Sequence, residues 1–201
     1  NMRDGKFLKN FEKFNLDRND IDYVMCTHLH ADHVGWNTML SNGKWVPTFP
    51  KAKYIFSKKD YDFFNNVKEG EQGYLSMIDS VRPIVDHGQA TLVDDNYTID
   101  NYIDLIPTPG HTPGHICIKL NSKEKNGIFT GDLIHHPILI SEPSIETNFC
   151  YDPKLAVMAR KKFIDKNIDT NTIIFPAHFS GSTAGYIKSS TYGNIFKSAK
   201  L

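Results

Sequence analysis

The chain has 201 residues, in which 23 lysines and arginines balance 23 acidic residues, so the formal net charge is zero. Hydrophobic residues make up 40% of the chain, enough for the core of one domain and too many for a disordered protein. The charge balance argues against binding to nucleic acid or to an anionic membrane surface. No apolar run reaches the roughly 18 residues that a membrane-spanning helix needs. Three cysteines do not make a disulfide scaffold, whereas nine histidines gather in a few short segments.

The first half of the chain alternates between helix and strand signals. The expected elements are a helix over 7–14, strands over 21–26 and 52–56, a helix over 57–64 and a helix over 75–83. Ser57 followed by Asp60 is typical of a helix N-cap. Pro83 is expected to end the last helix, with Leu75 on its apolar face. Residues 33–50 show no clear period and are expected to form a surface loop.

The second half is richer in strands. They are expected over 91–93, 97–99, 102–106, 116–120 and 127–130, with a last buried strand over 172–175. Asp152 followed by proline predicts the N-cap of a helix whose apolar face carries Leu155, Met158 and Phe163. Strands that come in runs and mix with helices favour a single α/β domain over residues 1–201 with substantially antiparallel sheet.

The strongest functional signal follows the strand expected at 21–26. There the sequence reads Thr-His-Leu-His-Ala-Asp-His, with four metal-binding side chains at His28, His30, Asp32 and His33. A chain that leaves the end of a strand can direct several side chains into one cavity. Imidazole and carboxylate together suit zinc, iron or manganese. A chance histidine-rich surface loop is the weaker interpretation of so tight a pattern.

Three later segments also place a metal-binding side chain beside a strand end. His111 lies in the turn 108–115, where two prolines and two glycines fix the backbone as a ligand requires. Asp132 and His178 each follow a predicted strand closely. His115 is expected to pack at the start of the next strand and at most to support the ligands. The repeated placement predicts that His111, Asp132 and His178 converge with the first cluster.

These segments together resemble the metallo-β-lactamase superfamily. Residues 28–33 match its H-x-H-x-D-H signature, and His111, Asp132 and His178 match its later ligands in order. The resemblance covers nearly the whole chain and implies an αβ/βα sandwich with the site along the edges of two packed sheets. The implied ligands are His28, His30 and His111 for a first metal, Asp32, His33 and His178 for a second, and Asp132 bridging both. The implied cofactors are two divalent metal ions, zinc above all, with iron, manganese or cobalt as alternatives.

Members of this superfamily usually carry several N-terminal strands before the signature. Only one helix and one strand are predicted ahead of it here, and the chain does not begin with methionine. The sequence is therefore expected to be N-terminally truncated and to lack strands of the first sheet. A cytoplasmic location is weakly favoured, although a signal peptide in the complete protein is left open.

Segments 32–37, 45–50 and 131–137 look like one subgroup, similar to N-acyl-homoserine lactonases and methyl-parathion-hydrolase-like enzymes. This resemblance implies a hydrolase in which a hydroxide bridging two metals attacks a lactone or ester carbonyl. Asp32 would orient the hydroxide and pass a proton to the leaving group. Two alternatives stay open: a phosphotriester hydrolase that uses the same site, and a catalytically incompetent metal-binding fragment.

Six more side chains close to the ligand segments are expected to contact the substrate. They are Trp36, Phe49, His135, His136, Phe149 and Phe179. The aromatic rings would form an apolar wall, with ordinary core packing as an even alternative for each. One of the two adjacent histidines is expected to face the pocket and the other to point away. Without a visible arginine cluster, the expected partner is a small neutral substrate with an apolar tail, and a homodimer is left open.

Overall fold

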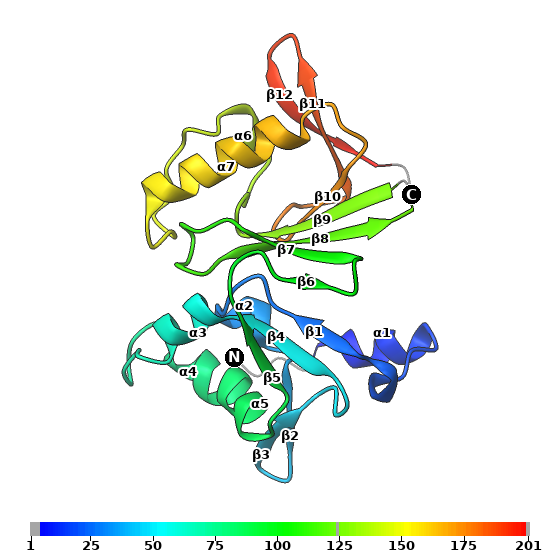
Figure 1. Ribbon diagram of the computed structural model, residues 1–201, viewed down its shortest axis with the longest axis vertical. Helices are drawn as coiled ribbons and strands as arrows, with labels where there is room; N and C mark the ends of the chain where they lie inside the picture. The colour runs from blue at the N-terminus through cyan, green and yellow to red at the C-terminus, as the bar shows by residue number, and fades with distance from the viewer. Residues whose placement is uncertain (1–4, 124, 200–201) are drawn as a thin grey trace.

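The computed structural model describes residues 5–123 and 125–199, which form two sheets packed face to face with helices on both outer sides (Figure 1). The smaller sheet is parallel and has the strand order β1 (Tyr23–Met25), β4 (Lys53–Ser57), β5 (Ala90–Val93). All three of its strands were predicted from the sequence. The predicted αβ/βα sandwich is therefore confirmed.

The larger sheet has seven strands in the order β12-β11-β10-β9-β8-β7-β6. They are β6 (Thr98–Ile99), β7 (Ile103–Pro107), β8 (Ile116–Ser122), β9 (Lys125–Gly131), β10 (Ile173–Pro176), β11 (Gly185–Ser190) and β12 (Gly193–Ser198). Strands β6 to β9 form an antiparallel meander, and β10 joins β9 in parallel, which requires a helical crossover between them.

The expectation that the buried strand at 172–175 is the last one was wrong, because the hairpin β11–β12 follows it. Ile187 of β11 is fully buried, whereas its chain neighbours Lys188 and Ser189 are not. The hairpin thus has few apolar residues, interleaved with polar ones. A search for continuous apolar runs misses such a strand pair.

Helices and one small hairpin accompany the smaller sheet. They are α1 (Phe7–Lys13), the 3-10 turn η1 (Arg18–Asp20), α2 (Ala31–Val34), β2 (Thr38–Ser41), β3 (Lys44–Pro47), α3 (Lys58–Phe64), α4 (Tyr74–Ser76), the π-helical turn η2 (Met77–Val81) and α5 (Arg82–Asp86). The hairpin β2–β3 replaces the surface loop expected over 33–50. Ser57 caps α3 as predicted, with its hydroxyl accepting from the Asp60 N–H at 3.5 Å.

Residues 74–86 form one helical run, so Pro83 does not end the helix as expected. Pro83 lies in the first turn of α5, where the missing N–H is not needed for an intrahelical hydrogen bond. The π-helical turn before it also changes which side chains face inward. Leu75 is 69% exposed instead of lining the core, whereas Val81 is fully buried.

Helix α7 (Pro153–Asn167) and the short α6 (Ile138–Ser141) cover the outer face of the larger sheet (Figure 1). Asp152 caps α7 as predicted, because its side chain accepts from the Leu155 N–H at 2.9 Å. None of the helices in the described ranges is long and apolar enough to cross a membrane.

The apolar face predicted for α7 is only partly right. Phe163 is buried, but Leu155 and Met158 are 37% and 66% exposed. The buried face includes Arg160, which is 1% exposed and donates to backbone carbonyls of the chain segments above it. These acceptors are the oxygens of Leu133 (3.1 Å), Pro143 (3.1 Å) and Ile145 (2.8 Å). The buried face of α7 is rotated from the predicted one because Arg160, which hydrophobicity alone assigns to the surface, is buried with its donors hydrogen-bonded.

An apolar cluster between the two sheets aligns their edges. Ile55 of β4 packs there with residues of the larger sheet, including Leu105 and Ile116. All three side chains are at most 4% exposed. This contact brings the ends of β1, β8, β9 and β10 to one edge of the sandwich.

The corrected face of α7 predicts two different mutational effects. Phe163→Ala should lower the free energy of unfolding by about 3–5 kcal/mol, because it leaves a cavity under the helix. Met158→Ala, on the exposed side, should change it by no more than about 0.5 kcal/mol. Urea denaturation of both variants gives the comparison, and losses of equal size would contradict this orientation of the helix.

Candidate metal centre

The seven metal ligands predicted from the sequence lie together at the edge where strands of both sheets end. The loop after β1 and helix α2 supply residues 28–33, and the turn between β7 and β8 supplies His111. Asp132 follows β9, and His178 follows β10. The structure arranges them in two groups, one of His28, His30, His111 and Asp132, the other of Asp32, His33 and His178.

The first group brings three imidazole nitrogens and one carboxylate oxygen face to face. His30 Nδ1 lies 3.1 Å from His28 Nε2 and 2.9 Å from His111 Nε2. Asp132 Oδ2 lies 3.2 Å from His111 Nε2 and 3.7 Å from His28 Nε2. There are too few protons to separate all of these ring nitrogens and the carboxylate oxygen, so some of their lone pairs face one another. A cation at the centre would stabilise this arrangement.

The second group lies on the other side of the same carboxylate. Asp132 Oδ1 is 3.0 Å from His33 Nε2 and 2.9 Å from His178 Nε2. Asp32 Oδ2 completes the group at 3.4 Å from His33 Nε2 and 3.6 Å from His178 Nε2. Asp132 therefore presents one oxygen to each group, which is the placement that a bridging ligand needs.

Two atoms of this cluster test whether metal ions fit here. His33 Nε2 and Asp132 Oδ1 are buried and have no hydrogen-bond partner, although they lie only 3.0 Å apart. Buried polar atoms are rarely left unpaired, because their desolvation is then uncompensated. Nitrogen and carboxylate oxygen are ligands that zinc accepts, so the residues present fit a divalent cation.

Burial keeps two imidazoles of the first group neutral, the form that binds metal. Burial lowers the pKa of His30 to about 4 and that of His28 further below its usual range. Burial also acts against protonation of His111, but its hydrogen bonds to Asp132 and Cys150 outweigh this and raise its pKa to about 9. Burial acts against ionisation of Asp132, yet hydrogen bonds from His111 and His135 hold its pKa well below the usual range.

His115 stands behind the ligands and orients one of them. Its Nε2 accepts from the Asp132 backbone N–H at 3.1 Å, so its Nδ1 carries the proton and donates to Thr108 Oγ1 at 2.8 Å. Burial lowers the pKa of His115 to about 3, which keeps this tautomer neutral. His28 is oriented similarly, with Nδ1 lying 3.1 Å from Thr27 Oγ1 and Nε2 facing the cluster. Such contacts fix the ring positions of metal-binding histidines.

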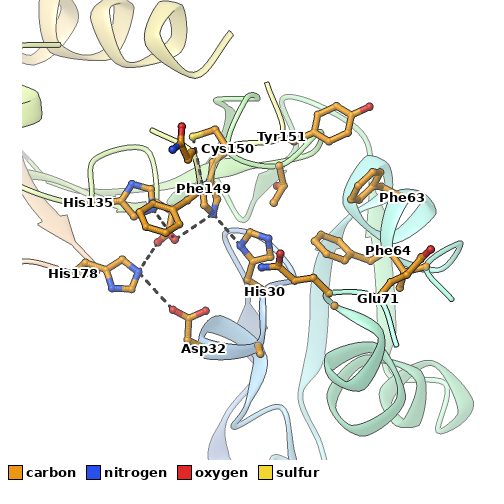
Figure 2. Close-up of a pocket in the computed structure, with 18 residues that line it drawn as sticks. His30, Asp32, Phe63, Phe64, Glu71, His135, Phe149, Cys150, Tyr151 and His178 are labelled. Carbon is orange, nitrogen blue, oxygen red and sulfur yellow. Dashed lines mark hydrogen bonds and ion pairs between the residues drawn. The ribbon is translucent and has the colours of Figure 1, made fainter. Parts of the chain in front are cut away.

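A cavity of about 640 Å³ opens beside the cluster. Figure 2 shows Asp32 and His178 at one end of the cavity and the rings of Phe63, Phe64 and Tyr151 at the other. Phe149 also lines it, as predicted, although its side chain is 76% exposed. The cavity therefore joins a polar end, where metals would lie, to an apolar end.

The two adjacent histidines after Asp132 point in different directions, as expected. His135 lines the cavity, with Nε2 lying 3.1 Å from Asp132 Oδ2. His136 is exposed and does not line it; its Nδ1 accepts from the Ile138 N–H at 3.2 Å. The predicted substrate contact of His136 therefore finds no support in this cavity. Its side chain is used to start α6 instead.

Three of the predicted aromatic wall residues pack elsewhere. Trp36 packs against Phe7 of α1 with ring centroids 5.0 Å apart, and Phe49 packs on the same helix and is 6% exposed. Phe179, also 6% exposed, packs on Phe196 of β12 at 4.9 Å. None of the three lines the cavity beside the cluster, so their predicted substrate contacts find no support there. Phe49 and Phe179 turn into the core, whereas Trp36 is half-buried against α1.

The apolar end of the cavity comes from residues that the sequence did not mark. Phe63 and Phe64 close helix α3, and Phe63 packs on Tyr151 with ring centroids 5.1 Å apart. Cys150 also lines the cavity, with Sγ lying 3.8 Å from His111 Nδ1. The paired phenylalanines at a helix end were the available signal, but nothing local tied them to the histidines.

Comparison with known families identifies the superfamily of this chain. The family model of the Metallo-beta-lactamase superfamily matches residues 3–185, and the chain belongs to that superfamily. A probable metallo-hydrolase of Methanocaldococcus jannaschii is 27% identical over 168 residues, which are 81% of this chain and 62% of that protein. An N-acyl homoserine lactonase of Bacillus thuringiensis is 20% identical over 182 residues, which are 87% of this chain and 62% of the lactonase. The chain thus spans less than two thirds of the length of these relatives.

Solved structures share the fold over nearly the whole chain. AidC, a dizinc quorum-quenching lactonase solved with its product N-hexanoyl-L-homoserine, superimposes with a TM-score of 0.80 at 25% identity, covering 100% of this chain and 72% of AidC. AbOPH, a hydrolase in the beta-lactamase superfamily, gives a TM-score of 0.83 at 23% identity, covering 98% of this chain and 70% of that one. The protein is therefore a member of a metallo-hydrolase superfamily, with lactonase homologues and a His/Asp cluster able to hold metal.

The two groups predict two divalent ions per chain. Elemental analysis of protein supplied with zinc should find about two ions. His28→Ala should lose one, and Asp132→Ala should weaken both, because the carboxylate faces both groups. His136→Ala is the matched control and should retain both ions. A native protein that binds one ion or none would contradict the binuclear interpretation.

Metal binding should depend on pH in a direction that His111 sets. Because its pKa in the metal-free protein is about 9, binding must displace a proton, and metal affinity should rise with pH up to about 9. Stability of the metal-free protein should run the opposite way. A pKa raised above the unfolded value of about 6.5 adds stability that is fully present below pH 6.5 and is lost as the pH rises through 9. Chelator competition and urea denaturation between pH 6 and 9 measure the two trends; trends in the same direction would contradict this assignment.

Proposed function

We propose that this protein is a binuclear metal-dependent hydrolase that cleaves lactone or carboxylic ester bonds. The observation that carries the proposal is the Asp132 carboxylate, which presents one oxygen to each of two histidine groups beside an apolar cavity. Two lactonases support it: the N-acyl homoserine lactonase that is similar in sequence, and the dizinc lactonase AidC that is similar in fold. The proposed metals are two divalent ions, zinc above all.

Two such ions, when bound, would lower the pKa of a water molecule to about 7 and would polarise the substrate oxygen. The remaining catalytic work falls to residues of this chain. Asp32 is an exposed carboxylate at the mouth of the cavity, and its Oδ2 lies within 3.6 Å of His178 Nε2. From there it accepts a proton during attack on the carbonyl and passes it to the leaving alkoxide.

His135 is the second group of the chain that can act on a substrate. It lines the cavity, and its Nδ1 is buried without a hydrogen-bond partner. A substrate that supplies a partner for this nitrogen would remove the cost of leaving it unpaired. We therefore assign His135 to substrate orientation, while its other nitrogen stays with Asp132.

The lining of the cavity supports a neutral substrate with an apolar tail. Phe63, Phe64 and Tyr151 offer aromatic surface, and the lining also includes the carboxylates of Asp32 and Glu71. No lysine or arginine of the described chain lines this cavity. Apart from the two metal ions themselves, a phosphomonoester or another anion would find no lysine or arginine of the described residues to hold it. For the same reason, nucleic acid is not a proposed substrate.

A neutral phosphotriester is the second candidate substrate. It meets the same requirements of charge, and a cavity of about 640 Å³ is large enough for either class. Attack by an activated water suits tetrahedral phosphorus as well as a planar carbonyl. The two candidates differ in the shape of the reacting centre.

A homoserine lactone series with increasing acyl length tests the proposal. We expect kcat/KM to rise with each methylene until the cavity is filled, by at most roughly 0.8 kcal/mol or about fourfold per step. Phe63→Ala should reduce kcat/KM for long tails more than for short ones, because it removes apolar wall without touching a ligand. Tyr192→Ala is the control, since this tyrosine is 96% exposed and does not line the cavity.

Each other outcome has a distinct meaning. An activity that does not change with acyl length would contradict the apolar wall. Faster turnover of paraoxon-like triesters than of every lactone would favour the second candidate. No turnover of esters or triesters by protein carrying two metal ions would contradict the proposed hydrolase and favour a metal-binding fragment.

A further inference from the structure

A buried carboxylate outside the metal ligands joins two of the segments that carry them. Asp60 lies in the first turn of α3 and is 0% exposed. Its Oδ2 accepts from the Leu29 N–H at 3.1 Å and from Thr112 Oγ1 at 3.0 Å. Its Oδ1 accepts from the Gly114 N–H at 2.6 Å.

The burial of this carboxylate needs an explanation. Moving a carboxylate out of water is costly unless it is paired or fully hydrogen-bonded. In the part of the chain that the structure describes, no lysine, arginine or histidine forms an ion pair with Asp60. Its three hydrogen bonds are therefore what compensates the burial, and all of them lead to segments of the metal centre.

The positions of the three donors show what these hydrogen bonds hold. Leu29 lies between His28 and His30, and Thr112 follows His111 directly. These histidines are the imidazole members of the first group. A backbone hydrogen bond also joins the same two segments: the Ile116 N–H donates to the Thr27 carbonyl at 2.9 Å. Asp60 adds a second connection close to the ligands themselves.

Close packing makes the connection rigid. A Cβ added to Gly114 would collide with the backbone nitrogen of Asp60 and with the Ser57 hydroxyl. The turn after His111 is therefore pressed against the start of α3, and only glycine permits this approach. Ligands that must hold a metal within about 0.5 Å of its preferred geometry need such support.

We propose that Asp60 is a positioning residue for the first metal site, setting the distance between the loop of His28 and His30 and the turn of His111. The proposal rests on the proposed binuclear centre and deepens it. Within the described residues, the Asp60 carboxylate is hydrogen-bonded to Leu29, Thr112 and Gly114, and it makes no hydrogen bond or ion pair with the second group, so its effect is on the first group and spares the second.

Asp60→Asn tests this with little change in volume. The amide replaces one acceptor oxygen with a donor, which then faces an N–H or O–H that has lost its acceptor. We expect one of the two metal ions to bind 10- to 100-fold more weakly, as for other partners of metal ligands, while the affinity of the other ion stays unchanged. Stepwise chelator competition on the full chain separates the two affinities.

Asp62→Asn is the matched control. Asp62 lies on the same helix but is exposed, and its carboxylate pairs with Lys58 on the surface. Both metal affinities should match those of the native protein. Thr112→Val removes one of the three hydrogen bonds and should weaken the same ion by a smaller factor, which Thr112→Ser should restore. The threonine pair decides the question if Asp60→Asn does not fold.

The outcomes separate this inference from the proposed function. Native affinity for both ions in Asp60→Asn, or equal weakening of both, would overturn the role of Asp60 and leave the hydrolase standing. Native affinity for both ions together with a lowered melting temperature would show that Asp60 stabilises the fold without positioning the ligands. A native chain that binds fewer than two ions would overturn the binuclear centre and the role of Asp60 with it.

Discussion

The carboxylate of Asp132 is the point around which the rest of the site is arranged. It lies within 3.7 Å of five imidazoles, with His28, His111 and His135 on Oδ2 and His33 and His178 on Oδ1. One anion cannot satisfy so many ring nitrogens, and burial lowers the pKa of His28 well below its usual range, so this ring does not take up a proton. The cluster is therefore an arrangement that the protein alone stabilises poorly. The packing of the surrounding sandwich has to hold it in place.

That packing explains why the ligands meet although they span most of the chain. The smaller sheet supplies residues 28–33, and the larger sheet supplies His111, Asp132 and His178. The apolar cluster between the sheets, with Ile55 on one side and Leu105 on the other, fixes their relative position. A shift of one sheet relative to the other would separate His28 and His30 from His111 and Asp132. The apolar core between the sheets thus holds the ligand segments in their relative positions.

The sequence predicted the ligands well because their signal is local. A polar side chain within a few residues of a strand end is a common position for a site residue, and this holds for His28, Asp132 and His178 alike. The aromatic wall was predicted poorly because nearness in sequence does not give direction. Phe179 is adjacent to a ligand and yet points into the core. The rings that line the cavity, such as Phe63, reach it through tertiary packing that no local pattern encodes.

The fold was predicted for the same reason, and its misses have physical causes. Strong apolar runs identified the central strands, whereas the edge hairpin β11–β12 has one buried face and carries too few apolar residues to stand out. The buried face of α7 is rotated from the predicted one, because Arg160 lies in the interior with its donors hydrogen-bonded to backbone carbonyls. Both cases show polar groups whose partners lie far away in sequence.

The division of the cavity between a strand-end cluster and separate aromatic segments has an evolutionary consequence. The groups that would carry out the reaction lie on the best-anchored parts of the sandwich. The rings that would select the molecule lie at the end of α3 and in the loop before α7, and Phe149 of that loop is 76% exposed. Substitutions in these two segments can change the molecules that enter while leaving the reactive centre intact. A lineage with this architecture can acquire new substrates in small steps, without passing through an inactive intermediate.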